Sequence, residues 1–487
     1  MKAFLKISGF VVLAILLVIV TRTLLHTPNN LVEINRVDIA LDKHLAAQHL
    51  SEAIQFQTVS HQIAEHRDQQ AFENFINWVA TTYPLLHQSL SLQRLNDTLL
   101  YKWEGSDPSL APILVTGHYD VVPVIPGTES NWHQPPFSGK IVDGVIWGRG
   151  ALDDKSGVIG ILESASYLLN EGYRPKRSIY LSLGHDEETG GENGAALVAA
   201  TLKTEGVQLA WSLDEGSFVL DDMLPGVSQL VAAINVAEKG SVTLEIAANS
   251  TGGHSSMPPQ KTAVGILAEA IVKLQQNPVP GGLEGLSLEM FDTISLYMPF
   301  IPRALFANRW LFGGILDRQM SKLPMTNAVL RTTTAPTMLS ASIKTNVLPI
   351  EAVAVVNFRI HPRDSVEDVV NYVKGVVEND DVEVRTPGNQ GQEASNVSDW
   401  NSEGFSIIGH SLQQAYGELV VTPGLMIAAS DSRHYGTVAD DAFRFNPFIV
   451  TSADLTGLHG TNEKISVDNL AAGIRAYTQI IKNGTSR

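Results

Sequence analysis

The order of apolar and polar residues divides this chain into two kinds of folding unit. Through most of the segment 41–236, short continuous apolar runs alternate with helical patterns. The runs Ile113–Thr116, Ser178–Leu183 and Leu209–Leu213 have the composition of buried strands in a largely parallel sheet. A helix capped by Ser156 is expected between the first two runs. The sequence therefore predicts an α/β fold with a mostly parallel sheet flanked by helices.

After residue 240 the pattern changes to strands that alternate apolar and polar residues. The elements expected there are a strand over Thr243–Ile246, a helix from Thr262 towards Leu274, strands over Ser340–Val347 and Ala352–Ile360, and a helix capped by Ser365 with Asp368. This order gives a βαββαβ unit, which predicts an inserted ferredoxin-like α+β lid domain.

These patterns predict the domain boundaries. We expect an N-terminal segment (1–30), the first part of the α/β domain (31–236), the inserted lid (237–389) and the second part of the α/β domain (390–487). A chain of 487 residues agrees with this division, because single cores rarely grow beyond about 250–300 residues.

The lid carries an extra segment between its first helix and its second strand. This segment is rich in proline, glycine and large apolar residues, including Phe291, Tyr297, Phe300, Trp310, Leu311 and Phe312. One interpretation is a helical elaboration packed on its own domain. The other is an apolar wall that faces a lipid-like substrate or a membrane surface.

The N-terminus has the charged-then-apolar order of an export signal. Lys2 and Lys6 precede the apolar run Ile7–Val20, and Arg22 follows it. The run is somewhat short for a bilayer, but lysine and arginine can snorkel to the interface. Because no small-residue cleavage site follows Val20, we expect an uncleaved signal anchor, a transmembrane helix that holds the rest of the chain on the extracytoplasmic (periplasmic or secreted) side. A buried N-terminal helix is the alternative, although the run lacks a polar face.

The net charge disfavours one class of function, and the lack of cysteine excludes one kind of metal site. The net charge of −17 disfavours binding to nucleic acid, which is itself a polyanion. The chain has no cysteine, so any zinc site must be built from histidine, aspartate and glutamate.

Three short motifs stand where predicted strands end. They are Gly117–Asp120, Gly148–Asp154 and His185–Glu188. Parallel strands bring their carboxyl ends to one edge of a sheet, which is where open α/β sheets bind ligands. One imidazole and several carboxylates at that edge can hold two metal ions about 3.5–4 Å apart, a geometry that activates water against an amide or ester. We therefore predict a two-metal hydrolase site.

These motifs, with Ser430–Arg433 and Leu458–Glu463, resemble those of the aminoacylase and carboxypeptidase S family of co-catalytic dinuclear zinc metallopeptidases. The similarity runs from about residue 41 to the C-terminus. Four segments are similar to the secreted branch that makes and cleaves N-fatty-acyl amino acids: Gly184–Glu188, Asn327–Thr334, Asn357–Pro362 and His459–Ser466. The resemblance implies a zinc-exopeptidase-like catalytic domain.

The resemblance also implies the metal ligands. Two Zn²⁺ ions per chain, for which Co²⁺ or Mn²⁺ could substitute, would be bound by His118, Asp153, Glu188, Asp214 and His459. Asp153 would bridge the two ions, and its peptide bond to Asp154 would be cis. Glu215 remains an alternative to Asp214, because the two residues are adjacent.

Other residues would act on the substrate by the same resemblance. Glu187 would be the general base, and Asp120 would fix the ring of His118. From the lid, His254 would stabilise the oxyanion, reaching from a second subunit if the lids pair two chains into a homodimer. Asn346 would assist it, and Arg359 and, less strongly, Arg433 would bind a substrate carboxylate. For either arginine, a structural salt bridge is the competing interpretation.

Together these residues predict a zinc-dependent amidohydrolase or metallocarboxypeptidase. Water activated by the dinuclear centre, with Glu187 as base, would cleave the amide bond of an N-acyl amino acid, and the same site could also form that bond. One alternative is a carboxypeptidase or dipeptidase acting on short peptides. Another is a non-catalytic anchored binding module, which would be expected to lack a ligand or the base. A serine hydrolase has no support, since no Gly-x-Ser-x-Gly motif is present.

Overall fold

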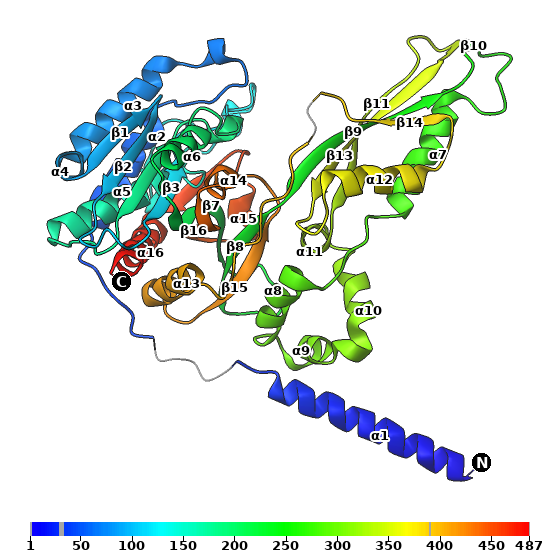
Figure 1. Cartoon of the computed structure of the whole chain (residues 1–487), viewed down its shortest axis with the longest axis horizontal. Coiled ribbons are helices and arrows are strands. Elements are labelled where there is room, and N and C mark those ends of the chain that lie inside the picture. Colours follow the sequence, from blue (N-terminus) through cyan, green and yellow to red (C-terminus); the bar gives the residue numbers. More distant parts are fainter. Residues whose placement is uncertain (1, 29–33, 389–390, 487) are drawn as a thin grey trace.

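Eight strands form the main sheet of the computed structural model, which describes residues 2–28, 34–388 and 391–486 (Figure 1). In spatial order they are β1 (Ser91–Leu95), β2 (Thr98–Trp103), β6 (Ile179–Gly184), β3 (Ile113–His118), β7 (Leu209–Leu220), β16 (Ala439–Val450), β8 (Leu230–Glu238) and β15 (Leu419–Met426). The pairs β6–β3, β3–β7, β7–β16 and β8–β15 are parallel, whereas β1–β2 and β2–β6 are antiparallel. The predicted mostly parallel sheet is confirmed.

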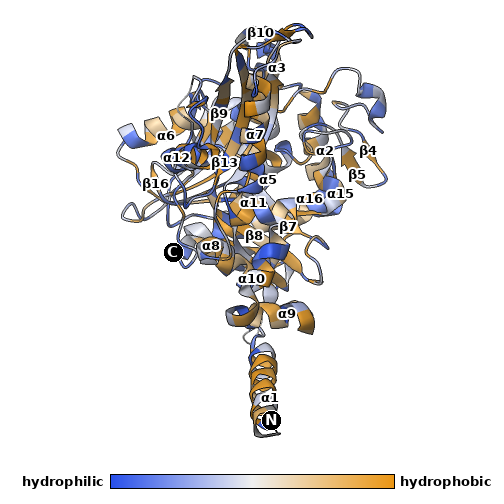
Figure 2. Cartoon of the chain, turned by 90° about the vertical axis from the view of Figure 1, so that its right-hand side faces the viewer, coloured by the Kyte–Doolittle hydropathy of each residue, from blue (hydrophilic) through white to orange (hydrophobic). Residues whose placement is uncertain are grey.

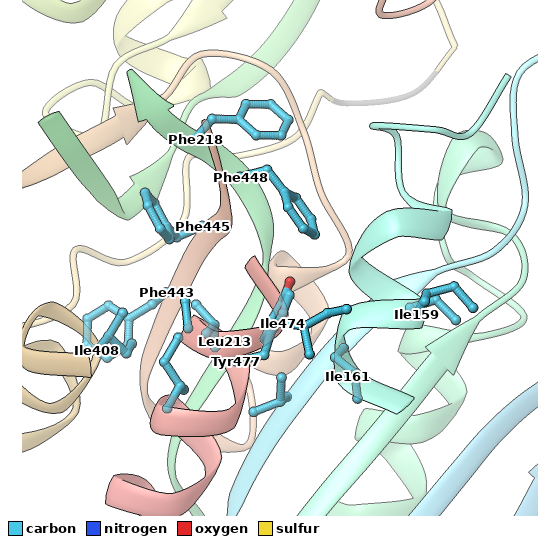
Figure 3. Close-up of a cluster of buried hydrophobic side chains, with 14 of the residues drawn as sticks. Ile159, Ile161, Leu213, Phe218, Ile408, Phe443, Phe445, Phe448, Ile474 and Tyr477 are labelled. Carbon is cyan, nitrogen blue, oxygen red and sulfur yellow. The ribbon is translucent and has the colours of Figure 1, made fainter. Parts of the chain in front are cut away.

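Helices cover both faces of this sheet, because its inner strands are apolar on both sides. In β3, Ile113 and Val115 belong to the larger core, whereas Leu114 belongs to a second core on the opposite face. The covering helices are α2 (Lys43–Gln55), α5 (Lys155–Asn170), α13 (Glu403–Tyr416) and α16 (Val467–Thr485) on one face and α6 (Ala195–Thr204) with α14 (Ser432–Tyr435) on the other. Figure 3 shows part of the larger core, in which Tyr477 of α16 and Leu213 of β7 are both buried.

The lid is a four-stranded antiparallel sheet with two helices on one face. Its strands lie in the order β11 (Thr333–Ser340), β13 (Glu351–Ile360), β9 (Gly240–Asn249) and β14 (Val382–Arg385), and its helices are α7 (Ala263–Gln276) and α12 (Val366–Val377). Every second residue of β13 is buried, as expected for a sheet covered on one face. Thr262 caps α7, and Ser365 with Asp368 forms a capping box on α12. The predicted ferredoxin-like order is confirmed.

Two expected elements are wrong in detail. The strand predicted over Ser340–Val347 lies earlier, at Thr333–Ser340. The residues that follow Ser340 form a turn, in which the Val347 amide donates a hydrogen bond to the Lys344 carbonyl. A two-residue strand, β12 (Val347–Leu348), then pairs with β10 (Gly253–His254). The helix predicted to be capped by Ser156 begins instead at Lys155.

The extra segment of the lid forms four helices, of which the first lies against the main sheet. They are α8 (Gly285–Ser295), α9 (Phe300–Ala307), α10 (Arg309–Met320) and α11 (Pro324–Leu330). Ile294 of α8 packs with Val231 and Val420 of the main sheet. Phe291 is buried, whereas Trp310 and Leu311 are exposed, so the segment has both a packed face and an open apolar face.

A small three-stranded sheet brings the last motif of the chain beside the second one. In it, β17 (Lys464–Ser466) pairs with β5 (Val145–Trp147), which pairs with β4 (Ile141–Val142). The remaining elements are α3 (Gln69–Thr82), α4 (Pro84–Ser89), α15 (Ser452–Leu455) and three short 3₁₀ turns (Ala64–His66, Glu129–Asn131 and Glu187–Thr189).

The first helix, α1 (Lys2–Leu25), projects away from the rest of the molecule (Figure 1). Its segment Lys6–Leu25 has a mean hydropathy of 2.4 and is the one helix in the described part of the chain that is long and apolar enough to cross a membrane. It is almost wholly exposed, which contradicts a buried soluble helix and suggests a signal sequence or an anchor.

Candidate metal centre

The ends of two strands and an irregular point in a third strand meet at one edge of the main sheet. His118 is the last residue of β3 and pairs with Gly184, the last residue of β6. Glu187 and Glu188 lie in the turn that follows β6. Asp214 was expected directly after a strand, but β7 continues past it to Leu220. The pairing of β7 with β16 is irregular just after Asp214, and this irregularity marks the local break in the strand.

Asp153 lies between the two predicted histidine ligands. Its Oδ1 is 3.2 Å from His118 Nε2, and its Oδ2 is 3.2 Å from His459 Nε2. Nε2 of His459 is also 3.3 Å from Glu188 Oε2. Each carboxylate oxygen of Asp153 thus faces a different imidazole, which is the arrangement that a carboxylate bridging two metal ions requires.

Two groups of side chains in the described residues could each hold a metal ion. One is His118 with Glu187 and Glu188, and the other is Asp153 with Glu188 and His459. Burial raises the pKa of Glu188, and hydrogen bonds with Asp153 and Glu188 raise the pKa of His459 to about 10. Charges crowded in this way favour a divalent cation.

Two buried carboxylate oxygens support this interpretation. Oε1 of Glu188 and Oδ2 of Asp214 have no hydrogen-bond partner among the described residues. A buried carboxylate without a partner is costly, and a metal ion would satisfy it. The donor set consists of nitrogen and oxygen atoms only, which suits zinc in a protein without cysteine. The residues at this edge therefore fit a pair of zinc ions.

The alternative ligands Asp214 and Glu215 face different surroundings. Burial raises the pKa of Asp214 to about 7 and raises that of Glu215 well above its usual range. Glu215 lines the same cleft as Glu187, whereas Asp214 is buried and accepts a hydrogen bond from the Glu215 amide at 2.9 Å. Neither belongs to the two groups named above, so the choice between them stays open.

Asp120 ties two of the loops together. Nδ1 of His118 is 3.1 Å from the Asp120 carbonyl oxygen and 3.4 Å from its carboxylate. The fully buried carboxylate accepts hydrogen bonds from the backbone amides of Glu187 and Glu188, and from the Ser60 hydroxyl at 2.6 Å. Asp120 can therefore orient the ring of His118, but through its backbone oxygen as the nearer partner.

Asp154 and Glu463 also support the centre, and Asp431 is buried near it; none of the three was assigned a role at the site from the sequence. The peptide bond between Asp153 and Asp154 is cis, as the resemblance implied. The Asp154 carboxylate accepts hydrogen bonds from the Asn446 side chain at 2.9 Å and from the His118 amide at 3.4 Å. Gly117 leaves room for it, because a Cβ there would lie 2.6 Å from Asp154 Oδ2.

Asp431 belongs to the motif Ser430–Arg433, and Glu463 ends the motif Leu458–Glu463. Glu463 is fully buried, pairs with Arg149 at 2.7 Å and accepts a hydrogen bond from the Leu152 amide at 2.8 Å. Burial and nearby carboxylates, first among them Asp214, raise the pKa of Asp431 well above its usual range. For both residues, the presence of a carboxylate within a motif of the family could have indicated a role at the site.

A cleft of about 640 Å³ opens in front of these groups. Glu187, Glu188 and His459 line it, and Arg359 and Arg433 line it from the lid and from α14. Arg433 donates a hydrogen bond to the Gly190 carbonyl at 2.9 Å. The guanidinium of Arg359 is exposed and, within the described residues, makes no hydrogen bond or ion pair, so it is free to bind an anion.

His254 and Asn346 lie far from this cleft in the same chain. β10 is at the distal tip of the lid (Figure 1), and the Ser255 amide donates a hydrogen bond to the Asn346 carbonyl there. Arg359 and Glu351 stand eight positions apart on β13, about 26 Å at the usual rise, and Asn346 precedes Glu351. In this structure neither residue reaches the metal centre of its own chain (Figure 1).

Comparisons with known proteins agree with this geometry. A model of the peptidase family M20/M25/M40 matches residues 114–483. The chain is 39% identical to the N-fatty-acyl-amino acid synthase/hydrolase PM20D1 of Mus musculus, over 89% of this chain and 86% of that protein. It is 30% identical to carboxypeptidase S of Saccharomyces cerevisiae, over 85% of this chain and 78% of that protein.

Solved structures show the same fold. An M20 family metallo-carboxypeptidase, Sso-CP2 from Sulfolobus solfataricus, has a TM-score of 0.62 at 18% identity and covers 90% of this chain and 98% of its own. Human carnosine dipeptidase 1 has a TM-score of 0.58 at 16% identity and covers 91% of this chain and 96% of its own. At these identities the likeness concerns the fold alone.

Proposed function

Because this chain belongs to the peptidase family M20/M25/M40 and is a metallopeptidase or amidohydrolase of that family, we propose that it hydrolyses the amide bond of N-acyl amino acids. The observation that carries the proposal is the Asp153 carboxylate between two imidazoles, in a cleft that Arg359 also lines without an ion pair to any residue that the structure describes. The similarity to an N-fatty-acyl-amino acid synthase/hydrolase supports this substrate class.

The family implies metal ions, typically two zinc ions, and we propose that His118, Asp153, Glu188, His459 and either Asp214 or Glu215 hold them. When bound, two zinc ions would polarise the substrate carbonyl and lower the pKa of a water molecule. The remaining steps belong to side chains of this chain.

Glu187 is the proposed general base and acid. Its Oε2 is 3.9 Å from His118 Nε2, so it stands beside the ligand groups, and it lines the open cleft where a substrate amide can reach it. Glu187 takes a proton from the attacking water and then delivers it to the nitrogen of the leaving amino acid. The products are a carboxylate and a free amino acid, and the reverse sequence of proton transfers would form the amide.

The walls of the cleft fit the two ends of such a substrate. Arg359 would bind the carboxylate of the amino acid through two parallel hydrogen bonds. Phe218, Met426 and Leu458 also line the cleft and would contact the acyl chain. His254 and Asn346 of a second copy would complete the site if the lids pair two chains.

A carboxypeptidase that acts on short peptides is the second candidate, and the similarity to carboxypeptidase S supports it. Both substrates end in a free carboxylate, so Arg359 does not separate them. Purified, zinc-loaded enzyme incubated with a panel of N-acyl amino acids and dipeptides, followed by mass spectrometry of the products, would do so. Cleavage of dipeptides without cleavage of long-chain N-acyl amino acids would contradict our proposal.

We further propose that α1 is an uncleaved membrane anchor and that the catalytic part lies on the extracytoplasmic side. The apolar segment Lys6–Leu25 supports a signal sequence or an anchor. Mass spectrometry of the N-terminal peptide from the membrane fraction tests which of the two it is. Recovery of only a chain that begins beyond Leu25 would contradict the anchor.

A further inference from the structure

The end of α1 is attached to the helices of the extra segment. Nε of Arg22 donates a hydrogen bond to the Ala307 carbonyl at 3.0 Å, and the Asn308 side chain donates to the Thr23 hydroxyl and to the Ile19 carbonyl, both at 3.3 Å. One turn further on, His26 Nε2 is 2.7 Å from the Ser295 hydroxyl. The contacts of Arg22 and Asn308 hold α9 and the start of α10 against the last turns of α1, and the contact of His26 attaches the residues after α1 to the end of α8.

The same helices expose large apolar side chains beside that junction. Ile301 is 77% exposed and Trp310 is 58% exposed, and Phe300, Leu311 and Ile315 are also open to solvent. Figure 2 shows α9 directly above the apolar helix α1, with the catalytic part on the far side of α9. Exposed apolar residues grouped in this way mark an interaction surface.

The length of α1 sets the height of this surface relative to a bilayer. The 20 residues Lys6–Leu25 form a helix of about 30 Å, which matches the hydrocarbon core. If α1 spans the bilayer, its last turns lie at the interface, and α9 lies there with them because it is bonded to those turns. The interface is the region where tryptophan is enriched in membrane proteins.

Charge favours the same occupant. The stretch from Phe300 to Met320 carries three arginines against the single acidic residue Asp317, a net charge of +2, or +1 when Asp292 of α8, which pairs with Arg309, is counted. The whole chain carries −17. An anionic lipid surface would attract this part of the molecule and repel most of the rest.

We propose that α9 and α10 form a membrane-docking surface, in which Ile301 and Trp310 enter the lipid interface next to the point where α1 leaves the bilayer. The docking surface would fix the orientation of the catalytic part on the membrane, so that the chain is held by two elements instead of swinging on one helix. This proposal rests on the retention of α1 as an anchor.

The absence of cysteine allows a clean test with the full chain. Single substitutions Ile301→Cys, Leu13→Cys and Ile343→Cys would each supply the only thiol for an environment-sensitive fluorophore. Ile343 is 100% exposed and lies in the loop at the tip of the lid, so it is a matched apolar control. The labelled chains are reconstituted into phosphatidylcholine vesicles that contain some phosphatidylglycerol, with and without nitroxide lipids, which carry the nitroxide near the headgroup in one set and near the middle of the bilayer in another.

We expect the nitroxide lipids to lower the fluorescence at position 301 at least about twofold and to leave that at position 343 unchanged. Trp310→Asp in the Ile301→Cys chain should weaken this quenching. Quenching at position 13 but not at position 301 would overturn the docking surface and leave the anchor intact. No quenching at position 13 would remove the anchor and the docking surface together. A blue-shifted label at position 301 that lipids do not quench would mean that a second copy of the chain covers the surface, which also overturns the proposal.

Discussion

The buried carboxylate of Glu463 accepts a hydrogen bond from the backbone amide of Asp153 at 3.1 Å. Through this contact, a residue near the C-terminus fixes the loop that carries the predicted bridging carboxylate. Arg149 completes the arrangement, because its guanidinium pairs with the other oxygen of Glu463 at 2.7 Å. Glu463 is thus a positioning residue for the candidate metal centre.

Glu463→Gln should weaken metal binding. The amide keeps the shape of the side chain but loses the charge that pairs with Arg149, and substitution of such supporting groups typically costs 10- to 100-fold in metal affinity. Competition with a zinc chelator measures the change. Glu129→Gln, at an exposed residue, is the control and should bind zinc like the wild type. Equal affinity in both variants would remove Glu463 from the supporting groups.

Glu187→Gln should lower kcat by at least about 10³-fold, because the proton acceptor is lost. If Glu187 is the base and not a ligand, the variant should still contain close to two zinc ions per chain. Parallel measurements of turnover and of metal content by plasma mass spectrometry test both statements. Loss of zinc together with activity would make Glu187 a ligand.

Arg359→Ala should raise KM for an N-acyl amino acid by about 10- to 100-fold, because the variant loses the hydrogen bonds between the guanidinium and the substrate carboxylate. The same variant should differ little from the wild type on a substrate whose carboxylate is blocked as an amide. Arg174→Ala, also at an exposed arginine, provides the control for a general loss of positive charge. An equal loss on both substrates would assign Arg359 a structural role.

Mild acid should destabilise the fold through His361. Burial, with Arg363 and Lys239 nearby, lowers the pKa of His361 from its usual 6.5 to about 3. Below pH 6.5 the unfolded chain therefore binds a proton that the folded chain does not, so stability falls as the pH falls. Between pH 6.5 and 5 this loss is about 2 kcal/mol.

His361→Gln removes that titration, so its melting temperature should fall less between pH 7 and pH 5 than that of the wild type. His410→Gln, at an exposed histidine of α13, should follow the wild type. If His361→Gln and the wild type lose the same number of degrees, His361 is not the source of the acid sensitivity.

Local patterns were enough to predict much of the fold. The buried strands β3 and β6 are continuous apolar runs, and the motifs that follow them had to meet at one sheet edge. In the lid, the alternation in β13 and the caps at Thr262 and Ser365 gave the order of the elements. These features depend only on neighbours in the sequence.

Features that depend on distant contacts could not be predicted. The sequence pattern pointed to Ser156 as the cap of α5, but Asp154 occupies that position. Asp154 makes no capping hydrogen bond, because its carboxylate accepts hydrogen bonds from the Asn446 side chain and the His118 amide. The support from Glu463 requires two loops that are more than three hundred residues apart. The attachment of α9 to α1 likewise links two segments that no local pattern connects.

The most direct test of the metal centre is an anomalous difference map from a crystal grown with Zn²⁺ and measured at the zinc absorption edge. Two peaks are expected, one on each side of the Asp153 carboxylate, near His118 and near His459. The map would also show whether Asp214 or Glu215 contacts the first ion. A map with no peak beside Asp153, or with a single peak in another part of the cleft, would contradict the central claim.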